Sequence, residues 1–321
     1  MSRTWAIMGT GTIAAALAEA IQAEGGSIAA VGSGSTERAQ AFAERFGIEH
    51  AHGTHHEVLS HDDVEVVYVA TTNERHHLDV QACLAAGVAV LNEKPFALDR
   101  EHAASVLDVA EKRGVFVAEA MWMRVHPGFV ALHEQLAAGV IGAPRLVQAD
   151  FGIVAEPDPT RRWFSREQGG GALLDVGIYP LTFAVSVLGP PKRIRALGEL
   201  ASTGVDAQLA VAMTHEQGLS SWSCSFVADS GVEATVAGET GSLRLGGPFH
   251  HSSELTRRER DRVVETIEVV DADLGYRHEV REVHRCLDAG LTESPALSHT
   301  DTLAVLEAMD AIREQVGVSY A

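Results

Sequence analysis

Three short segments of the sequence carry residue types that could perform redox chemistry. The first is Gly9-Thr-Gly11, which separates an apolar run beginning at Trp5 from an alanine-rich stretch ending at Ile21. This order predicts a strand, a tight turn and a helix. Gly9 allows the sharp turn, Gly11 lets the backbone approach a pyrophosphate, and Ala14 stands where a third glycine often sits. An ordinary strand-to-helix turn is the alternative, and we favour a dinucleotide site.

A phosphate held at this turn would rest on backbone N–H groups that a helix leaves unpaired in its first turn. In this chain those groups belong to Thr12 and Ile13. The turn therefore predicts where the phosphates of a nucleotide would bind.

The second segment is Glu93-Lys94-Pro95, which follows an apolar run from Val88 to Leu91. Pro95 biases the backbone of Lys94 away from helical angles, so strand conformation should hold up to the lysine. Open α/β sheets bind their ligands at the carboxyl ends of strands. A solvated lysine at a strand end is the alternative, and we expect Lys94 to face a ligand.

The third segment starts at Gly169-Gly-Gly171 and contains Asp175 and Tyr179. We expect a helix from these glycines to about Leu188, on which residues four apart share one face and can meet one ligand. Taken alone, the residues fit a different interpretation slightly better: Asp175 as a helix-cap or ion-pair residue, and Tyr179 as a core tyrosine.

The elements that would position these segments divide the chain into two domains. Up to residue 122, apolar runs alternate with helical patterns, which predicts a Rossmann domain with a doubly wound parallel sheet. From 123 to 321 we expect an α+β domain with an open, largely antiparallel sheet, whose C-terminal helix is free to pack back on the first domain. The helices are expected at 14–21, 36–46, 76–86, 100–113, 127–136, 276–289 and 300–315, and the strands of the first domain at 5–8, 27–31, 64–70, 88–91 and 115–118.

Composition narrows the function classes. The formal net charge of −19 argues against nucleic acid or an anionic membrane as a general partner. The three cysteines (Cys83, Cys224 and Cys286) are scattered, which suits a reducing compartment. No apolar run approaches the roughly 18 residues of a membrane span, so we expect a soluble cytoplasmic protein. The histidines at 50, 52, 55 and 56 and the pair His250-His251 are expected in surface connections or loops, with no metal bound.

The order of these motifs resembles the Gfo/Idh/MocA oxidoreductase family. The resemblance rests on Gly9-Thr-Gly11, Asn73 with His76, Glu93-Lys94-Pro95, and Asp175 with Tyr179. Two further segments, 118–127 and 162–164, are similar to its branch of dimeric dihydrodiol dehydrogenases and glucose–fructose oxidoreductases. The resemblance spans nearly the whole chain. The departure is Thr71-Thr72-Asn73, where relatives commonly carry proline in the middle.

The resemblance implies a nicotinamide cofactor, a substrate flanked by Lys94 and Tyr179, and a homodimer or homotetramer formed through the second domain's open sheet. The cofactor-binding positions that follow are Gly9, Gly11, Thr12, Ile13, Ser33, Gly34, Arg38, Thr71, Asn73, His76, Glu93 and Lys94, and the catalytic positions are Lys94, Asp175 and Tyr179.

The end of the second expected strand favours NADP over NAD. NAD-binding proteins usually place an acidic residue there to hold the ribose 2′-hydroxyl. This chain instead has Ser33 and Ser35, which offer hydroxyls, and Arg38, whose cation suits a 2′-phosphate. The Ser33-Gly34 and Arg38 arrangement also resembles that of NADP-using relatives.

A mechanism follows from the chemistry of alcohol oxidation. An alcohol that loses hydride must also lose its hydroxyl proton, so a base belongs within hydrogen-bond reach of that oxygen. Tyr179 is the expected acid/base. Free tyrosine has a pKa of about 10, and the cation of Lys94 would favour the phenolate. Asp175 would bind a second hydroxyl or hold Lys94.

We therefore expect an NADP-dependent dehydrogenase or reductase of a small polyhydroxylated ring, such as a sugar, an inositol-like ring or a cyclic diol. Two other functions remain open: a non-catalytic NADP sensor, and an enzyme that cleaves glycosides by transient oxidation. Arg124, His126 and Trp163 either line the cleft or serve packing.

Overall fold

The computed structural model describes residues 3–320, which form two compact units. The described part of the first unit is residues 3–122 with 276–302, and that of the second is 123–275 with 303–320. The second domain expected from the sequence is thus interrupted, because the segment 276–302 folds with the first unit.

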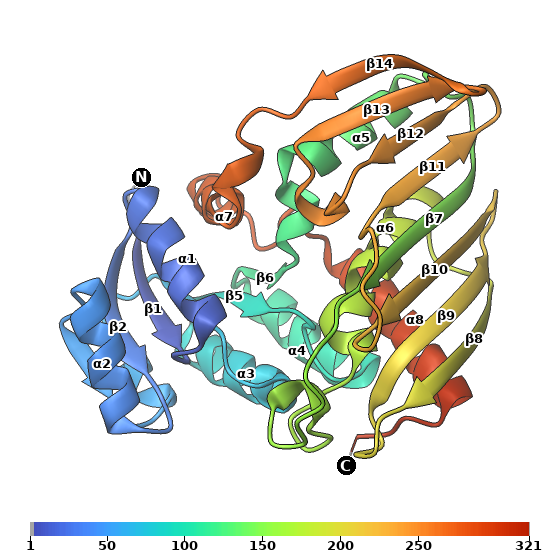
Figure 1. Cartoon of the computed structure of the whole chain (residues 1–321). Helices are drawn as coiled ribbons and strands as arrows, with labels where there is room; N and C mark the ends of the chain where they lie inside the picture. Colours follow the sequence, from blue (N-terminus) through green and yellow to red (C-terminus); the bar gives the residue numbers. More distant parts are fainter. Residues whose placement is uncertain (1–2, 321) are drawn as a thin grey trace. The chain divides into compact units, whose positions relative to one another are not determined.

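The first unit is built on a parallel sheet of six strands in the order β3-β2-β1-β4-β5-β6 (Figure 1). This is the strand order of a doubly wound dinucleotide-binding fold, and it confirms the predicted fold class. The strands are β1 (Thr4–Met8), β2 (Ser27–Gly32), β3 (His50–His52), β4 (Val66–Val69), β5 (Ala89–Glu93) and β6 (Val117–Ala120). The helices between them are α1 (Thr12–Ala23), α2 (Thr36–Phe46), α3 (His76–Ala86) and α4 (Arg100–Arg113).

Local sequence signals set the bounds of these helices. The side chain of Asp99 caps α4 by accepting a hydrogen bond from the backbone N–H of His102 at 2.8 Å. Gly87 ends α3 and Gly114 ends α4, both in left-handed backbone conformation. These signals explain why the predicted bounds of α3 and α4 agree with the structure.

Strand β3 corrects the expectation of a surface connection around His50 and His52. Its three residues pair with the end of β2, and Ser33 N–H donates to the carbonyl of His52 at 3.1 Å. The ring of His61 lies 2.8 Å from that of His52, Nε2 to Nε2. Among the described residues, no three histidine, cysteine or carboxylate side chains are arranged as a metal site.

Helix α7 (Arg277–Asp288) completes the first unit. Its buried side chains include Val280 and Val283, and it packs against α1. The indole N–H of Trp5 in β1 donates to Nε2 of His284 in α7 at 3.1 Å. The segment after α7 then bonds the edge of the sheet, where Val117 N–H donates to the carbonyl of Thr292 at 3.2 Å.

The second unit contains a sheet of eight strands in the order β14-β13-β12-β11-β7-β10-β9-β8. The pair β7 and β10 is parallel and the other pairs are antiparallel, as the expected largely antiparallel sheet requires. Helix α6 (Ile178–Leu188) packs on β7 and β10. The strands are β7 (Pro144–Gly152), β8 (Arg193–Leu200), β9 (Asp206–Thr214), β10 (Leu219–Ser225), β11 (Ala234–Gly238), β12 (Ser242–Leu245), β13 (Glu254–Glu259) and β14 (Arg262–Glu268), and the other helices are α5 (Pro127–Ala137) and α8 (His299–Val316), of which α8 begins within the first unit.

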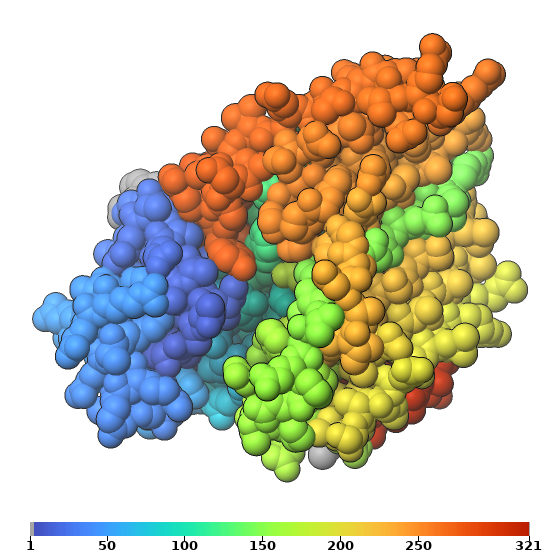
Figure 2. All heavy atoms as spheres, in the orientation of Figure 1, coloured from blue at the N-terminus to red at the C-terminus, as the bar shows by residue number. Residues whose placement is uncertain are grey.

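One face of this second sheet is left open. Burial alternates along β10, where Trp222 and Cys224 are buried while Ser221 and Ser223 are exposed. Figure 2 shows side chains of these strands at the surface, with no helix over them in this view. The helices therefore cover one face and leave the other to solvent.

Among residues 3–320, no helix combines the length and the apolar character that a membrane crossing requires. The cytoplasmic location stays a prediction.

Candidate active site

The carboxyl ends of three strands meet at Gly9. This residue has φ +113°, and a Cβ built on it would lie 2.2 Å from the carbonyl oxygen of Ala70, which follows β4. Its N–H donates to the carbonyl of Gly32, the last residue of β2, at 2.8 Å. Any larger side chain would both strain the backbone and collide with β4.

The N-terminus of α1 has the features of a phosphate site. Gly11 is its N-cap and provides no side-chain hydrogen bond to the first turn. A Cβ on Gly11 would meet no atom within 4 Å, and Thr12 is exposed while Ile13 is partly exposed. The first turn of α1 thus has no side-chain cap and is exposed at Thr12, which fits the pyrophosphate of a dinucleotide.

The turn after β2 places Arg38 over Gly34. A Cβ on Gly34 would lie 3.9 Å from a terminal nitrogen of the Arg38 guanidinium. Ser33 is buried, with its hydroxyl 3.3 Å from that of Thr10. Ser35 is occupied locally, because its hydroxyl donates to Glu37 at 2.7 Å and accepts the N–H of Arg38 at 3.3 Å. Arg38 is thus the cation available at this turn.

His76 joins the two loops that carry the remaining cofactor-binding candidates of the first unit. The ring lies 2.7 Å from the carbonyl of Pro95 through Nδ1 and 3.2 Å from the carbonyl of Thr71 through Nε2. It is buried, as is Asn73, which opens the short 3₁₀ turn before α3. In these contacts His76 holds the loops together.

Asp79 was missed by the sequence analysis, where it reads as a first-turn helix acid. It is fully buried and accepts hydrogen bonds from the hydroxyl of Thr71 at 2.7 Å and from Arg75 at 2.7 Å, while the ring of His56 lies 2.8 Å away. Burial alone would raise its pKa. The hydrogen bonds from Thr71 and His56, with the charge of Arg75, hold the pKa of Asp79 below its usual value. Asp79 therefore fixes Thr71 as an ionised acceptor.

Glu93 fixes the turn that presents Lys94. Its carboxylate is buried and accepts the phenolic O–H of Tyr68 and, at 3.1 Å, the backbone N–H of Lys94. On the other side of the turn, the N–H of Phe96 donates to Glu119 at 3.0 Å. The backbone on both sides of Lys94 is therefore anchored by a buried carboxylate.

A third buried acid, Glu279 of α7, lies near these two carboxylates. Burial raises its pKa well above the usual value, and the charges of Glu93 and Glu119 raise it further. Neither oxygen of Glu279 has a hydrogen-bond partner among the described residues. Burial and these two charges therefore favour its protonated form. Because a glutamate in the first turn of a helix is usually solvated, the sequence carries no signal for this residue.

The second unit brings Asp175 and Tyr179 close along the chain, but not on one regular helix. Residues Leu173–Gly177 form a π-helical turn, and α6 begins only at Ile178. This corrects the expected continuous helix; π turns are frequent at functional sites. A guanidinium nitrogen of Arg162 donates to Asp175 Oδ1 at 3.1 Å. Asp175 therefore has the partner that its interpretation as an ion-pair residue requires.

Tyr179 lies among aromatic rings. Its ring centre is 5.5 Å from that of Phe151 and 5.1 Å from that of His250, while His250 stacks on Phe151 at 4.7 Å. His250 belongs to a 3₁₀ turn, Phe249–His251, which corrects the expected plain loop pair. His250 and Tyr179 are 71 positions apart in the chain, so no local sequence pattern predicts that their rings lie together.

Asp206 supports the backbone in front of the π turn. It is fully buried, and its Oδ2 accepts the N–H of Leu173 at 2.6 Å. No described residue hydrogen-bonds its Oδ1. Burial raises the pKa of Asp206 to about 6, although the hydrogen bond from Leu173 opposes this.

Two of the three residues of open role make packing or capping contacts within the second unit. His126 is buried and caps α5, because its Nδ1 accepts the N–H of Gly128 at 3.1 Å and its Nε2 therefore donates to the carbonyl of Ala272 at 2.8 Å. Trp163 stacks on Phe226 with ring centres 5.8 Å apart. Arg124 lies in the 3₁₀ turn Trp122–Val125.

The predicted site residues thus form two groups. The cofactor-binding candidates and Lys94 lie at the carboxyl ends of β1, β2, β4 and β5 in the first unit, and Asp175 and Tyr179 lie in the second.

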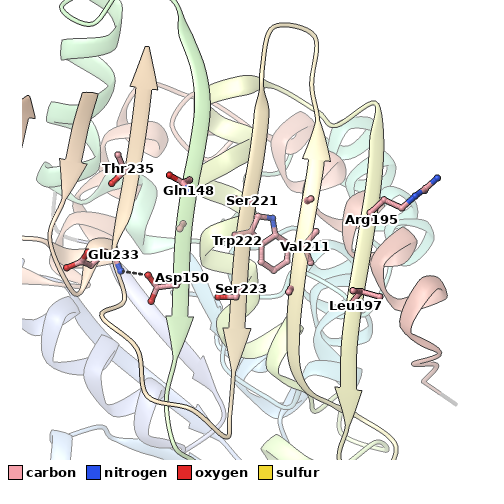
Figure 3. A pocket seen from close by; sticks show the side chains of 13 residues that line it. Gln148, Asp150, Arg195, Leu197, Val211, Ser221, Trp222, Ser223, Glu233 and Thr235 are labelled. Carbon is pink, nitrogen blue, oxygen red and sulfur yellow. Dashed lines mark hydrogen bonds between the residues drawn. The ribbon is translucent and has the colours of Figure 1, made fainter. Parts of the chain in front are cut away.

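A separate groove of about 690 Å³ lies on the second unit's sheet (Figure 3). It spans β8, β9, β10, β7 and β11 and is lined largely by small or polar side chains such as Ala210, Ala212, Ser221 and Gln148. It holds neither Asp175 nor Tyr179.

Comparison with known proteins gives matches in both parts of the chain. The family model described as "Oxidoreductase family, NAD-binding Rossmann fold" matches residues 3–121, and that of the GFO/IDH/MocA C-terminal domain matches residues 129–244. The trans-1,2-dihydrobenzene-1,2-diol dehydrogenase of Macaca fascicularis is 31% identical, with 100% of this chain and 98% of that protein covered.

Two solved structures are similar over nearly the whole chain. A 3-ketoreductase from Actinomadura kijaniata, in complex with NADP and TDP-benzene, has a TM-score of 0.85 at 27% identity, with 98% of both chains covered. A levoglucosan dehydrogenase, in complex with NADH and levoglucosan, has a TM-score of 0.87 at 19% identity, with 99% of this chain and 97% of that one covered; it supports the fold alone.

We predict that Asp206 makes the free energy of unfolding depend on pH. Its pKa of about 6 in the folded chain exceeds its ordinary value of 3.8, so the folded state binds this proton more tightly than the unfolded state. Protonated Asp206 therefore adds roughly 3 kcal/mol to the free energy of unfolding below about pH 4. This stabilisation is lost as the pH rises to about 6. Urea unfolding of the wild type and of Asp206→Asn across this range isolates the effect, because asparagine does not titrate. A difference between the two proteins that stays constant with pH would contradict it.

Proposed function

The chain belongs to the GFO/IDH/MocA oxidoreductase family, and from this premise we propose that it is an NADP-dependent dehydrogenase or reductase. Its substrate is a secondary alcohol, or the matching carbonyl, of a small sugar, an inositol-like ring or a cyclic diol. Tyr179 is the acid/base and Lys94 assists it. The observation that carries the proposal is the 31% identity to a dehydrogenase over the whole chain.

The residues of the first unit fit a dinucleotide. The open first turn of α1 takes the pyrophosphate, and the loops held by His76 lie where the strands end. When bound, the nicotinamide supplies or accepts the hydride. Lys94, whose turn is anchored by Glu93, orients the substrate oxygen and stabilises the phenolate of Tyr179.

In the oxidising direction, Tyr179 takes the hydroxyl proton of the substrate, and in the reducing direction it returns a proton to the alkoxide. Asp175 accepts a hydrogen bond from a neighbouring hydroxyl. Its partner Arg162 orients this carboxylate.

Two observations support a ring-shaped substrate. The rings of Phe151 and His250 beside Tyr179 offer flat faces. The curated relative from Macaca fascicularis is named for a cyclic diol, and the similar structure from Actinomadura kijaniata is named a 3-ketoreductase. The proposed site would therefore favour vicinal hydroxyls on a ring.

We predict that Tyr179→Phe lowers kcat by roughly 10²- to 10⁴-fold, because it removes the hydroxyl that acts as the proposed acid/base. NADP affinity should stay unchanged. Lys94→Met should lower kcat at least comparably, whereas Lys112→Met, an exposed lysine of α4, serves as the matched control. The measurement is reduced-nicotinamide absorbance with a panel of sugars, inositols and cyclic vicinal diols.

A normal rate in Tyr179→Phe would overturn its role. Tight NADP binding by the wild type without turnover of any substrate in the panel would instead favour a sensor.

Arg38 supports NADP over NAD. Its guanidinium lies over Gly34, and β2 ends in Val31-Gly32 followed by Ser33, without an acidic residue to hold a 2′-hydroxyl.

We predict that Arg38→Gln raises the dissociation constant of NADP by about 10- to 100-fold, since a charge-assisted phosphate contact is lost. Affinity for NAD should change little. Isothermal titration with both cofactors measures this, and Arg45→Gln, near the other end of α2, is the matched control. Tighter binding of NAD than of NADP by the wild type would overturn the preference.

The open sheet supports self-association into a homodimer or homotetramer. Neighbouring strands of this sheet align their residues in rows. In one row, Leu197 of β8 lies opposite Ala210 of β9, which lies opposite Ser223 of β10. Leu197, on the edge strand β8, presents an apolar side chain that is 80% exposed on this open face.

We predict that Leu197→Arg weakens self-association by at least about 30-fold, because it introduces a charge into the proposed contact. Leu78→Arg, at an exposed position of α3 in the first unit, is the matched control. Sedimentation velocity across a concentration series measures the oligomeric state, and a monomeric wild type would disprove the contact.

A further inference from the structure

Residues 319 and 320 lie against the glycine segment that precedes the proposed catalytic residues. The phenolic O–H of Tyr320 donates to the carbonyl of Gly170 at 2.6 Å. Arg166 holds Ser319 through two hydrogen bonds of 2.6 Å, to its carbonyl and to its hydroxyl. The guanidinium of Arg313 lies 4.9 Å from the ring centre of Tyr320. Burial raises the pKa of Tyr320, so its hydroxyl remains a donor at any ordinary pH.

Asp206 holds the same backbone from the start of β9. Its Oδ2 accepts the N–H of Leu173, three residues beyond the carbonyl that Tyr320 holds. Gly171 lies between them with φ +122°, and a Cβ there would lie 2.4 Å from Asp206 Oδ1 and 3.3 Å from the Tyr320 hydroxyl. The side chains of Asp206 and Tyr320 therefore pack against Gly171, where the backbone has no room for a side chain.

The backbone held in this way leads directly to Asp175. The N–H of Gly171 donates to the carbonyl of Trp163 at 2.9 Å, and its carbonyl accepts the N–H of Asp175 at 3.2 Å. Arg162, next to Trp163, donates to the side chain of Asp175. A displacement of Gly171 would thus move both the backbone of Asp175 and the residue beside its ion-pair partner.

We propose that Tyr320 and Asp206 are positioning residues that act through this backbone. They clamp residues 170–173 and so set the positions of Asp175 and Tyr179 relative to the substrate. This inference rests on the proposed function of those two residues. Tyr320 touches neither cofactor nor substrate in this role, and neither does Asp206.

The test is Tyr320→Phe in the full chain, which removes one hydroxyl and keeps the ring on Arg313. We expect kcat/KM for the ring substrate to fall by about 5-fold, the effect of one neutral hydrogen bond. The dissociation constant of NADP should stay within about 2-fold, because the first unit binds it. Hydrogen exchange should accelerate in peptides covering 166–177.

The matched control is Ser220→Ala, which removes the 2.8 Å contact of this hydroxyl with the ring of His215, elsewhere in the second unit. It should lower the melting temperature without changing kcat/KM or exchange at 166–177. An equal loss of activity in both variants, or normal activity and exchange in Tyr320→Phe, would overturn the clamp.

Asp206 provides a second, independent arm. Asp206→Asn keeps an acceptor for Leu173 and should keep most of the activity, whereas Asp206→Ala leaves that N–H without its acceptor and should lose about 10-fold. If both behave alike, Asp206 is not a positioning residue. The exchange measurement does not depend on the reaction, so full activity in Tyr179→Phe would refute the proposed function while exchange still reported on the clamp.

Discussion

The absence of a side chain at Gly9 is the constraint on which the first unit depends. The carbonyl of Ala70 occupies the space where a Cβ would stand, and the N–H of Gly9 bonds to Gly32. The ends of β1, β2 and β4 can meet only because this residue has no side chain and tolerates a positive φ. Each loop that carries a cofactor-binding candidate starts from one of these ends or from the neighbouring β5.

The loops beyond that point are held by buried polar groups rather than by apolar packing. Asp79 fixes Thr71, His76 joins the loops, and Glu93 anchors the turn of Lys94. Directional bonds of this kind hold a backbone in one place, which a site for hydride transfer needs, because reacting atoms must approach closely and in line. The charges of Glu93 and Glu119, together with burial, raise the pKa of the third acid, Glu279.

The sequence predicted the elements whose signals are local. The helices α3 and α4 were placed correctly because Gly87 and Gly114 mark their ends, and the parallel sheet followed from the alternation of apolar runs and helices. Strand β3 was not predicted, because its three residues, His50-Ala-His52, include no β-branched side chain.

What the sequence could not predict depends on contacts distant in the chain. A Cβ on Gly177 would lie 2.8 Å from Cys224 Sγ, so the π turn lies closely against β10, a contact that helical periodicity does not contain. The same holds for His250 beside Tyr179 and for the burial of Glu279. The individual residues could be named from motifs, but the groups that support them could not.

The interrupted first unit has a consequence for how the protein is made. The indole of Trp5 finds its partner in His284, and the edge of the sheet at Val117 is bonded by Thr292. On the ribosome, the nucleotide-binding sheet therefore emerges early and must wait for about 150 intervening residues before its last helix arrives. Residues 123–275, which are most of the second unit, are translated within that interval, and residues 303–320 follow only after α7. The first unit is therefore completed only after most of the second has been synthesised.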